Sequence, residues 1–179
     1  MFTGKVLNVS AGENIDKEGR TYDQYFERAD EFWMTNHSGG NRGFQNRSNE
    51  INVDLEKPIP SEYRLQYDVV FNHTTLEHIF NVFTAFQNIC LFSKDIVILV
   101  VPFVQEEHFG DTYKDYWRFT PECIRELFNR NEFHVLYESC NNDFNTSVYL
   151  FFIASRVPEK WETIIPNKKI KNAGKWVGG

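Results

Sequence analysis

The residues best suited to chemistry lie in one aromatic-rich stretch, residues 101–121. It holds His108 near several carboxylates, followed by Tyr116 and Arg118. A histidine beside carboxylates can act as a general base on a hydroxyl, and an arginine can hold an anionic group. An aromatic loop packed over a sheet, with Arg118 in a structural ion pair, explains the same residues equally well. A metal cluster of His108 with its acidic neighbours is disfavoured, because their spacing is not one that a helix or a hairpin would use to bring such ligands together. We therefore expect no metal.

Two features elsewhere in the chain are typical of the edge at which parallel sheets bind ligands. Ser10, Ala11 and Gly12 follow the first predicted strand, and a turn of such small residues lets a ligand approach the backbone closely. Asp54 ends another predicted strand, where its carboxylate could accept hydrogen bonds from a ribose or an exocyclic amine. Each feature alone also has a structural explanation: a plain strand-to-helix turn, and a solvated Asp at a strand end.

A polar run lies between a predicted buried strand and a predicted helix. Asn72 and His73 close the strand. Because ligands bind outside the carboxyl ends of parallel strands, we expect these two side chains at the ligand-binding edge. Glu77 and His78 come one turn into the predicted helix, where we favour structural roles such as capping or a contact with a carbonyl.

Short apolar runs that alternate with amphipathic stretches predict the α/β sheet that would position these residues. The run at 95–101 is the clearest strand, a continuous series of β-forming residues stopped by Pro102. The last two predicted strands have no helix pattern between them and should form an antiparallel pair. Strands are predicted at 5–9, 31–36, 50–54, 67–72, 95–101, 133–137 and 147–154.

Two helices are predicted between these strands. Residues 76–92 carry apolar side chains close to a 3.6-residue period, with Thr74 or Thr75 as the N-cap. The second helix opens at Thr120, which caps it, and Pro121 occupies the first helical position. Both helices have an apolar face that can pack against the sheet.

Composition limits the class of protein. The chain has 179 residues, 41% of them hydrophobic, which suits one domain at 1–155 followed by a solvated basic C-terminal tail at 156–179. A net charge of −6 predicts no nucleic-acid-binding surface over the whole chain. A mean hydropathy of −0.48 and the absence of a long apolar run predict no membrane span or export signal. Three cysteines without CxxC spacing indicate reduced thiols in a cytoplasmic protein.

Taken in order along the chain, these motifs resemble one family. Residues 6–14, Asp54-Leu55, the YDVV…LEH stretch at 67–78 and the DYWRFTP stretch at 115–121 look like a class I S-adenosylmethionine-dependent methyltransferase. The chain is similar to the small type 11 methyltransferase-like proteins, often associated with bacterial surface-glycan or secondary-metabolite synthesis. The resemblance implies a Rossmann-like sheet of seven strands, mostly parallel with an antiparallel last strand, and lacking the usual N-terminal covering helices.

The resemblance also implies where S-adenosylmethionine would bind. The small-residue turn after the first strand matches the family's glycine-rich turn, which contacts the methionine part of the cofactor. Asp54 matches the acid that contacts the adenine amine, and Leu55 would pack on the ring. Asn8 and Asn36 stand where the family usually has acids, which removes carboxylate acceptors, although an Asn carbonyl still accepts. The implied cofactor-binding residues are Asn8, Ser10, Ala11, Gly12, Asn36, Asp54, Leu55 and Asn72.

The function that the resemblance implies is methyl transfer to an oxygen or nitrogen of a small or glycan-like acceptor. The chemistry needs positioning and a base, because the sulfonium is already activated. His108 is the first candidate for that base and His73 the second. Tyr116 and Arg118 would orient the acceptor.

Two other functions stay open. A non-catalytic methyltransferase-like binding module with a degenerate cofactor site would account for the lost acids and the absent covering helices. In an active enzyme, a neighbouring subunit of a homo-oligomer would instead close the site. An NAD-type dehydrogenase fits less well, because the first turn lacks GxGxxG.

Overall fold

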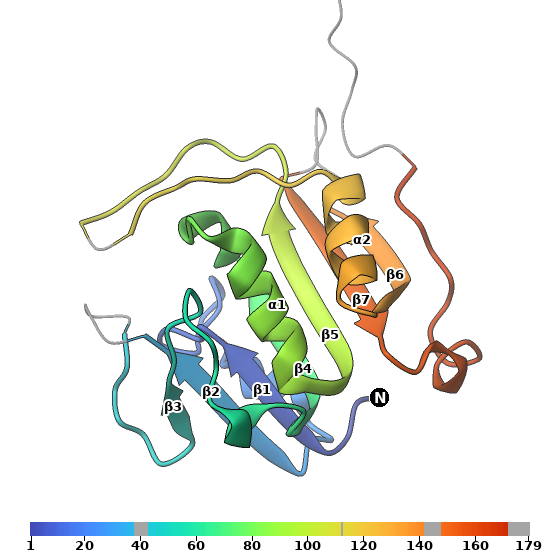
Figure 1. Ribbon diagram of the computed structural model, residues 1–179, viewed down its shortest axis with the longest axis horizontal. Coiled ribbons are helices and arrows are strands. Elements are labelled where there is room, and N and C mark those ends of the chain that lie inside the picture. Colours follow the sequence, from blue (N-terminus) through green and yellow to red (C-terminus); the bar gives the residue numbers. More distant parts are fainter. Residues whose placement is uncertain (38–42, 112, 142–147, 172–179) are drawn as a thin grey trace, which may run out of the picture.

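Residues 1–37, 43–111, 113–141 and 148–171 are described in the computed structural model, and they form one mixed β-sheet with α-helices on one face (Figure 1). The sheet has seven strands in the order β3-β2-β1-β4-β5-β7-β6. β7 runs antiparallel to both of its neighbours, and the other pairs are parallel. The predicted fold class is therefore confirmed. The strands are β1 Lys5–Val9, β2 Glu31–Asn36, β3 Glu50–Asn52, β4 Tyr67–His73, β5 Ser93–Pro102, β6 His134–Cys140 and β7 Tyr149–Ser155.

The strand boundaries follow the predicted ones to within a few residues. β3 is shorter than the predicted 50–54, and β5 and β6 are longer than predicted. Ser147, where the last strand was expected to begin, lies outside the described residues. Side chains alternate between two apolar clusters, with Leu7 and Val9 on the helix-covered face and Val6 on the other.

Helix α2, Pro121–Arg130, begins as the sequence predicts. The Thr120 side chain accepts a hydrogen bond from the Cys123 N–H at 3.2 Å, and Pro121 takes the first helical position, where its missing N–H costs nothing. Ile124 and Phe128 are buried against the sheet. Local signals alone were sufficient to place this helix.

Helix α1, Val82–Phe92, begins six residues later than the predicted 76–92, and neither Thr74 nor Thr75 caps it. Leu76–His78 instead forms the short 3-10 helix η3. The Tyr116 N–H bonds the Glu77 carbonyl at 2.7 Å, and the Trp117 indole N–H bonds the Ile79 carbonyl at 3.0 Å. These carbonyls are therefore used by a distant loop instead of by helical hydrogen bonds.

The opposite face of the sheet carries no α-helix among the described residues (Figure 1). The 3-10 helix η1, Tyr22–Phe26, covers part of it. Another part is covered by the segment after β7, in which Trp161 and Ile165 are only 7% and 4% exposed. Trp161 and Ile165 therefore depart from the predicted solvated tail, while residues 172–179 lie outside the described part.

In the described part of the chain, no helix combines the length and the apolar character that crossing a membrane requires.

Candidate functional site

The turn after β1 is fastened to the end of β2. The Ser10 N–H bonds the Thr35 hydroxyl at 3.0 Å, and the Ala11 N–H bonds the Thr35 carbonyl at 3.0 Å. The Gly12 N–H bonds Asn36 Oδ1 at 2.7 Å, and Gly12 adopts a left-handed φ of 57° that glycine tolerates. The turn lies at the predicted edge, but its amide donors already have partners within the chain.

The Asn36 side chain holds this turn in place through hydrogen bonds. Its Oδ1 accepts from the Gly12 N–H, and its Nδ2 donates to the Gly12 carbonyl at 3.1 Å and to Glu50 Oε1 at 2.6 Å. The side chain is 2% exposed. The position matches the one implied for ribose binding, yet both ends of the amide are engaged by the protein itself.

Asn8 and Asn72 are both buried beside the turn but differ in how they are satisfied. Asn8 Nδ2 donates to Asn14 Oδ1 at 2.9 Å, which ties the first strand to the segment behind the turn. Asn72 Nδ2 donates to the Val9 carbonyl at 2.9 Å. Asn72 Oδ1 is buried and has no hydrogen-bond partner among the described residues. It is an acceptor left over at the carboxyl ends of β1 and β4.

Asp54 and Leu55 follow β3 but point to different surroundings. The Asp54 carboxylate accepts the Glu56 N–H at 3.0 Å and lies 3.0 Å from Lys57 Nζ. Burial by itself would raise the pKa of Asp54, but its hydrogen bonds with Lys57 and the Glu56 N–H outweigh burial and lower the pKa. Leu55 is 4% exposed and belongs to the main core.

His73 ends β4 and is mostly enclosed by aromatic rings. Its ring centroid lies 5.8 Å from that of Tyr22 and 6.3 Å from that of Tyr149. Nδ1 lies 2.8 Å from the Thr74 hydroxyl. Burial lowers the pKa of His73 below its usual value, so the imidazole is neutral at pH 7 and can accept a proton.

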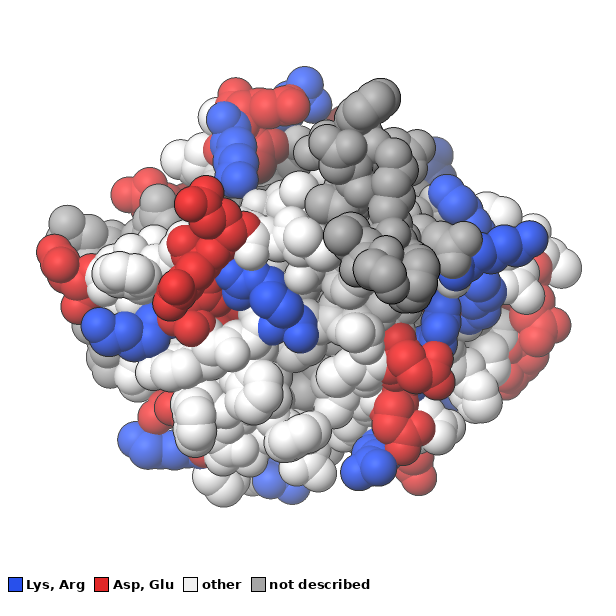
Figure 2. Space-filling view, turned by 90° about the horizontal axis from the view of Figure 1, so that it is seen from above, with Lys and Arg blue, Asp and Glu red and all other residues white. Residues whose placement is uncertain are grey.

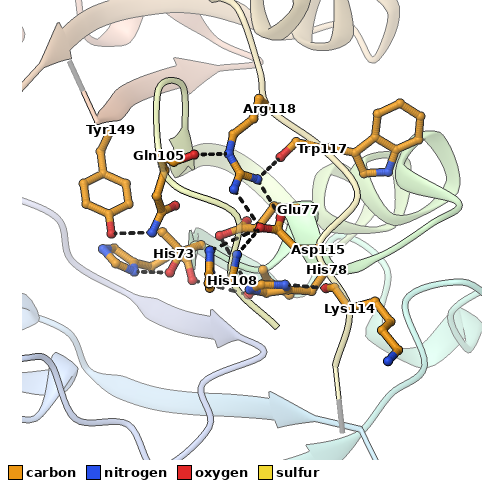
Figure 3. Close-up of polar contacts among 12 residues, drawn as sticks. His73, Glu77, His78, Gln105, His108, Lys114, Asp115, Trp117, Arg118 and Tyr149 are labelled. Carbon is orange, nitrogen blue, oxygen red and sulfur yellow. Dashed lines mark hydrogen bonds and ion pairs between the residues drawn. The ribbon is translucent and has the colours of Figure 1, made fainter. Parts of the chain in front are cut away.

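Arg118 is the structural centre of the loop between β5 and α2 (Figure 3). Two of its N–H groups bond the Asp115 carboxylate at 2.6 Å each, and the others bond the carbonyls of Gln105, Glu106 and Trp117. All five guanidinium donors are thereby used, so none is left for a substrate anion. The structural ion pair considered for Arg118 is what the structure contains.

Tyr116, the other residue predicted to orient an acceptor, lies on the surface. It is 46% exposed, and its ring stacks edge-on against Phe80 with centroids 5.3 Å apart. Its backbone fastens the loop to η3, whereas its side chain is open to solvent. Tyr116 is therefore available to a ligand, unlike Arg118.

His108 is brought together with Glu77 and His78, which the sequence analysis had placed in structural roles. His78 does contact a carbonyl, since its Nδ1 lies 2.6 Å from the Lys114 oxygen. Glu77 is 0% exposed, and neither carboxylate oxygen has a hydrogen-bond partner among the described residues. Burial raises the pKa of Glu77 to about 7. No spacing signal could have found this cluster, because only the contact between η3 and the loop creates it.

A hollow lies at the opposite edge of the sheet. It measures about 220 Å³ and is lined by Asp68, Asp95, Lys160 and Trp161, near the amino ends of β4 and β5. Asp95 is bonded there by the Lys160 ammonium and the Trp161 indole, both at 3.0 Å. We regard the carboxyl edge as the candidate site, since open α/β sheets bind ligands there.

The face seen from above in Figure 2 carries acidic and basic side chains side by side. Basic side chains gather at the right-hand edge of this view, with acidic side chains below them.

No protein-family model matches the sequence, and no curated protein matches it. Solved structures do share its architecture. An S-adenosylmethionine-dependent methyltransferase from Mesorhizobium loti is 10% identical, with a TM-score of 0.59 over 85% of this chain and 90% of the other. Magnesium protoporphyrin IX methyltransferase from Synechocystis, with bound S-adenosylmethionine, is 13% identical, with a TM-score of 0.55 over 84% of this chain and 69% of the other.

The chain has the fold of the S-adenosylmethionine-dependent methyltransferases. A structure assigned by its name to the Zn-dependent alcohol dehydrogenases, from Rhodobacter sphaeroides, also matches it, at 13% identity and a TM-score of 0.62 over 85% of this chain and 83% of the other. At such identities the likeness concerns the fold and not the reaction.

Proposed function

We propose that this protein binds S-adenosylmethionine at the carboxyl ends of β1, β3 and β4 and transfers its methyl group to an oxygen or nitrogen of a small or glycan-like acceptor. The observation that carries the proposal is the sheet itself, with the order β3-β2-β1-β4-β5-β7-β6 and an antiparallel β7. The strand order reverses next to β1, and doubly wound sheets bind nucleotide-like ligands at such a point.

Two side chains at this edge are suited to hold the cofactor. The unpartnered Asn72 Oδ1 would accept a hydrogen bond from a donor such as the ammonium of the methionine part. The partly exposed Asp54 carboxylate would accept from the adenine amine. Asn36 and Leu55 take no part in this proposal, because the first is bonded to Gly12 and Glu50 and the second lies in the core.

The chain has little chemistry to supply beyond positioning and a base. When bound, the cofactor's sulfonium supplies a methyl group that is already activated for transfer. His73 is the base we favour, because it adjoins Asn72 on β4 and burial keeps it neutral. It would take the proton that the acceptor hydroxyl or amine gives up. Tyr116 would present its exposed ring and hydroxyl to the acceptor.

The cofactor assignment is tested by titrating the protein with S-adenosylhomocysteine in a calorimeter. Asp54→Ala should weaken binding at least tenfold, the effect of removing one hydrogen bond to a charged group. Asp68→Ala is a matched control, since Asp68 also accepts a backbone N–H, that of Lys5 at 2.8 Å, and lies 3.7 Å from a lysine, but at the other edge of the sheet. The control should bind as the wild type does.

Failure to bind S-adenosylhomocysteine at millimolar concentration would refute the enzyme proposal. It would favour the second candidate, a non-catalytic binding module, which the engagement of Asn36 by Gly12 and Glu50 supports. Binding of NADH in the same assay would instead support a dehydrogenase. Light scattering with and without ligand tests the further proposal that a second copy closes the site.

A cytoplasmic location belongs to the same proposal. Cys90, Cys123 and Cys140 are all free in the structure, as expected where thiols are kept reduced.

A further inference from the structure

Glu77, His78 and His108 form a compact group of metal-ligating side chains. One donor atom from each lies within 4.8 Å of the others, and His78 Nε2 lies 3.8 Å from Glu77 Oε1. Glu77 and His78 come from η3, whereas His108 comes from the loop after β5. Figure 3 shows the three side chains close to the Arg118 and Asp115 pair.

The Glu77 carboxylate is the unusual member of the group. Its side chain is completely buried, yet neither oxygen has a hydrogen-bond partner among the described residues. Buried carboxylates in proteins are normally paired, hydrogen-bonded or bound to a metal ion. The Arg118 guanidinium could have paired with Glu77, but its N–H groups donate to Asp115 and to loop carbonyls instead.

Both histidines are held in the orientation that a metal ligand needs. His78 Nδ1 lies 2.6 Å from the Lys114 carbonyl, which can only accept, so Nδ1 carries the proton and Nε2 keeps its lone pair. His108 Nδ1 faces the Glu106 carbonyl at 3.2 Å and Asp115 Oδ2 at 3.3 Å. This arrangement likewise leaves the lone pair on Nε2. Histidine ligands in metal sites use a carbonyl or a carboxylate in this way.

We propose that Glu77, His78 and His108 bind a divalent transition-metal ion of the Zn²⁺ class, with Asp115 and the Lys114 carbonyl orienting the two histidines. Two imidazoles and one carboxylate match zinc, whereas Mg²⁺ and Ca²⁺ prefer oxygen ligands alone. Three protein ligands leave a further position for water or for a ligand oxygen. The site is independent of methyl transfer, and it differs from the cluster of His108 with its sequence neighbours.

Binding requires a small closure of the loop onto η3. Donor atoms around a tetrahedral Zn²⁺ lie about 3.4 Å apart, since each is about 2.1 Å from the ion. The separations of up to 4.8 Å would have to shrink by up to about 1.4 Å. The His108 side chain is 36% exposed on a loop, so it can move without disturbing the core.

The test uses the full chain, stripped of metal with a chelator and titrated with Zn²⁺ and Co²⁺. We expect one equivalent to bind, a cobalt spectrum of nitrogen and oxygen ligation, and a Tm that rises with metal concentration. Glu77→Gln and His108→Ala should each weaken binding at least tenfold and abolish most of the Tm shift. His134→Ala, an exposed histidine on β6, is the matched control and should bind like the wild type.

Several results would overturn the proposal. These are the absence of stoichiometric binding, undiminished binding by both Glu77→Gln and His108→Ala, or a thiolate charge-transfer band that assigns the ion to cysteine. Glu77→Gln keeps the size of the side chain and removes a buried charge, so it should fold. Circular dichroism of each metal-free variant verifies this. His108→Ala, at the exposed end of the cluster, tests metal binding independently of whether Glu77→Gln folds.

Discussion

At the scale of single residues, the buried polar groups are of two kinds: those bonded within the protein and those left available to a ligand. Asn36 and Glu50 satisfy each other and the surrounding backbone. By contrast, Asn72 Oδ1 and the Glu77 carboxylate have no partner in the described residues. Because leaving a buried polar atom unpaired is costly, such atoms point to partners outside the chain. Asn72 Oδ1 is a supporting contact in the cofactor proposal, and the Glu77 carboxylate is one of the three ligands in the metal proposal.

Placing an acid at position 36 should destabilise the fold. Asn36→Asp removes both donors of Nδ2 and places a second carboxylate beside Glu50, whose Oε1 lies 2.6 Å from that nitrogen. We expect a loss of about 2–4 kcal/mol in the free energy of unfolding, measured with urea at pH 7. The double variant Asn36→Asp with Glu50→Gln should recover part of it, because the new amide can donate. An unchanged single variant would contradict this account of Asn36.

At the scale of elements, the two helices show how far local signals reach. α2 starts where its capping threonine and first-turn proline predict. α1 starts six residues later than its apolar period predicts, because the loop containing Tyr116 and Trp117 takes up the carbonyls of η3. A period shows which face of a helix is apolar, but it does not show whether another segment competes for the backbone.

The cap of α2 makes a direct test at this scale. Thr120→Val keeps the shape of the side chain but removes the acceptor for the Cys123 N–H. The free energy of unfolding should fall by about 1 kcal/mol in urea melts. Thr120→Ser keeps an oxygen at the cap and should stay close to the wild type. Equal destabilisation by both changes would show that the hydroxyl is not the contributing group.

At the scale of the whole molecule, the segment after β7 packs back against the sheet. Glu138 on β6 holds it: its carboxylate accepts from Arg125 at 2.7 Å and from the Ile170 N–H at 3.1 Å. Its backbone N–H bonds the Lys168 carbonyl at 2.7 Å. Burial by itself would raise the pKa of Glu138, but the Arg125 hydrogen bond, the Ile170 N–H and the Lys169 charge outweigh it and lower the pKa.

This lowered pKa predicts a pH dependence. A carboxyl whose pKa falls on folding contributes stability above its unfolded value of about 4.5, and the contribution is lost as the pH falls below that value. Glu138→Gln should therefore cost about 1–3 kcal/mol at pH 7, and the difference from the wild type should shrink towards pH 3. Urea unfolding at both pH values measures this. A difference that is the same at both would rule out the charge as its source.

The sequence by itself determined the approximate positions of the strands, the α/β class and the start of α2, because alternation, runs of β-forming residues and caps act over a few neighbouring residues. The Rossmann-like arrangement of the strands was implied only by the family resemblance. The sequence also predicted Asn72, His73 and the turn of Ser10 to Gly12 at the carboxyl edge of the sheet, since strand ends and turns follow from the same local patterns.

Only the tertiary structure decided which polar groups remain available. In the folded chain, Asn36 forms hydrogen bonds with Gly12 and Glu50, and every Arg118 donor is bonded within its own loop. Folding also places His108 next to Glu77. It also packs Trp161 into the second face of the sheet. These outcomes depend on contacts between segments far apart in the chain. A local sequence pattern does not show which distant residue forms a hydrogen bond with a given polar group.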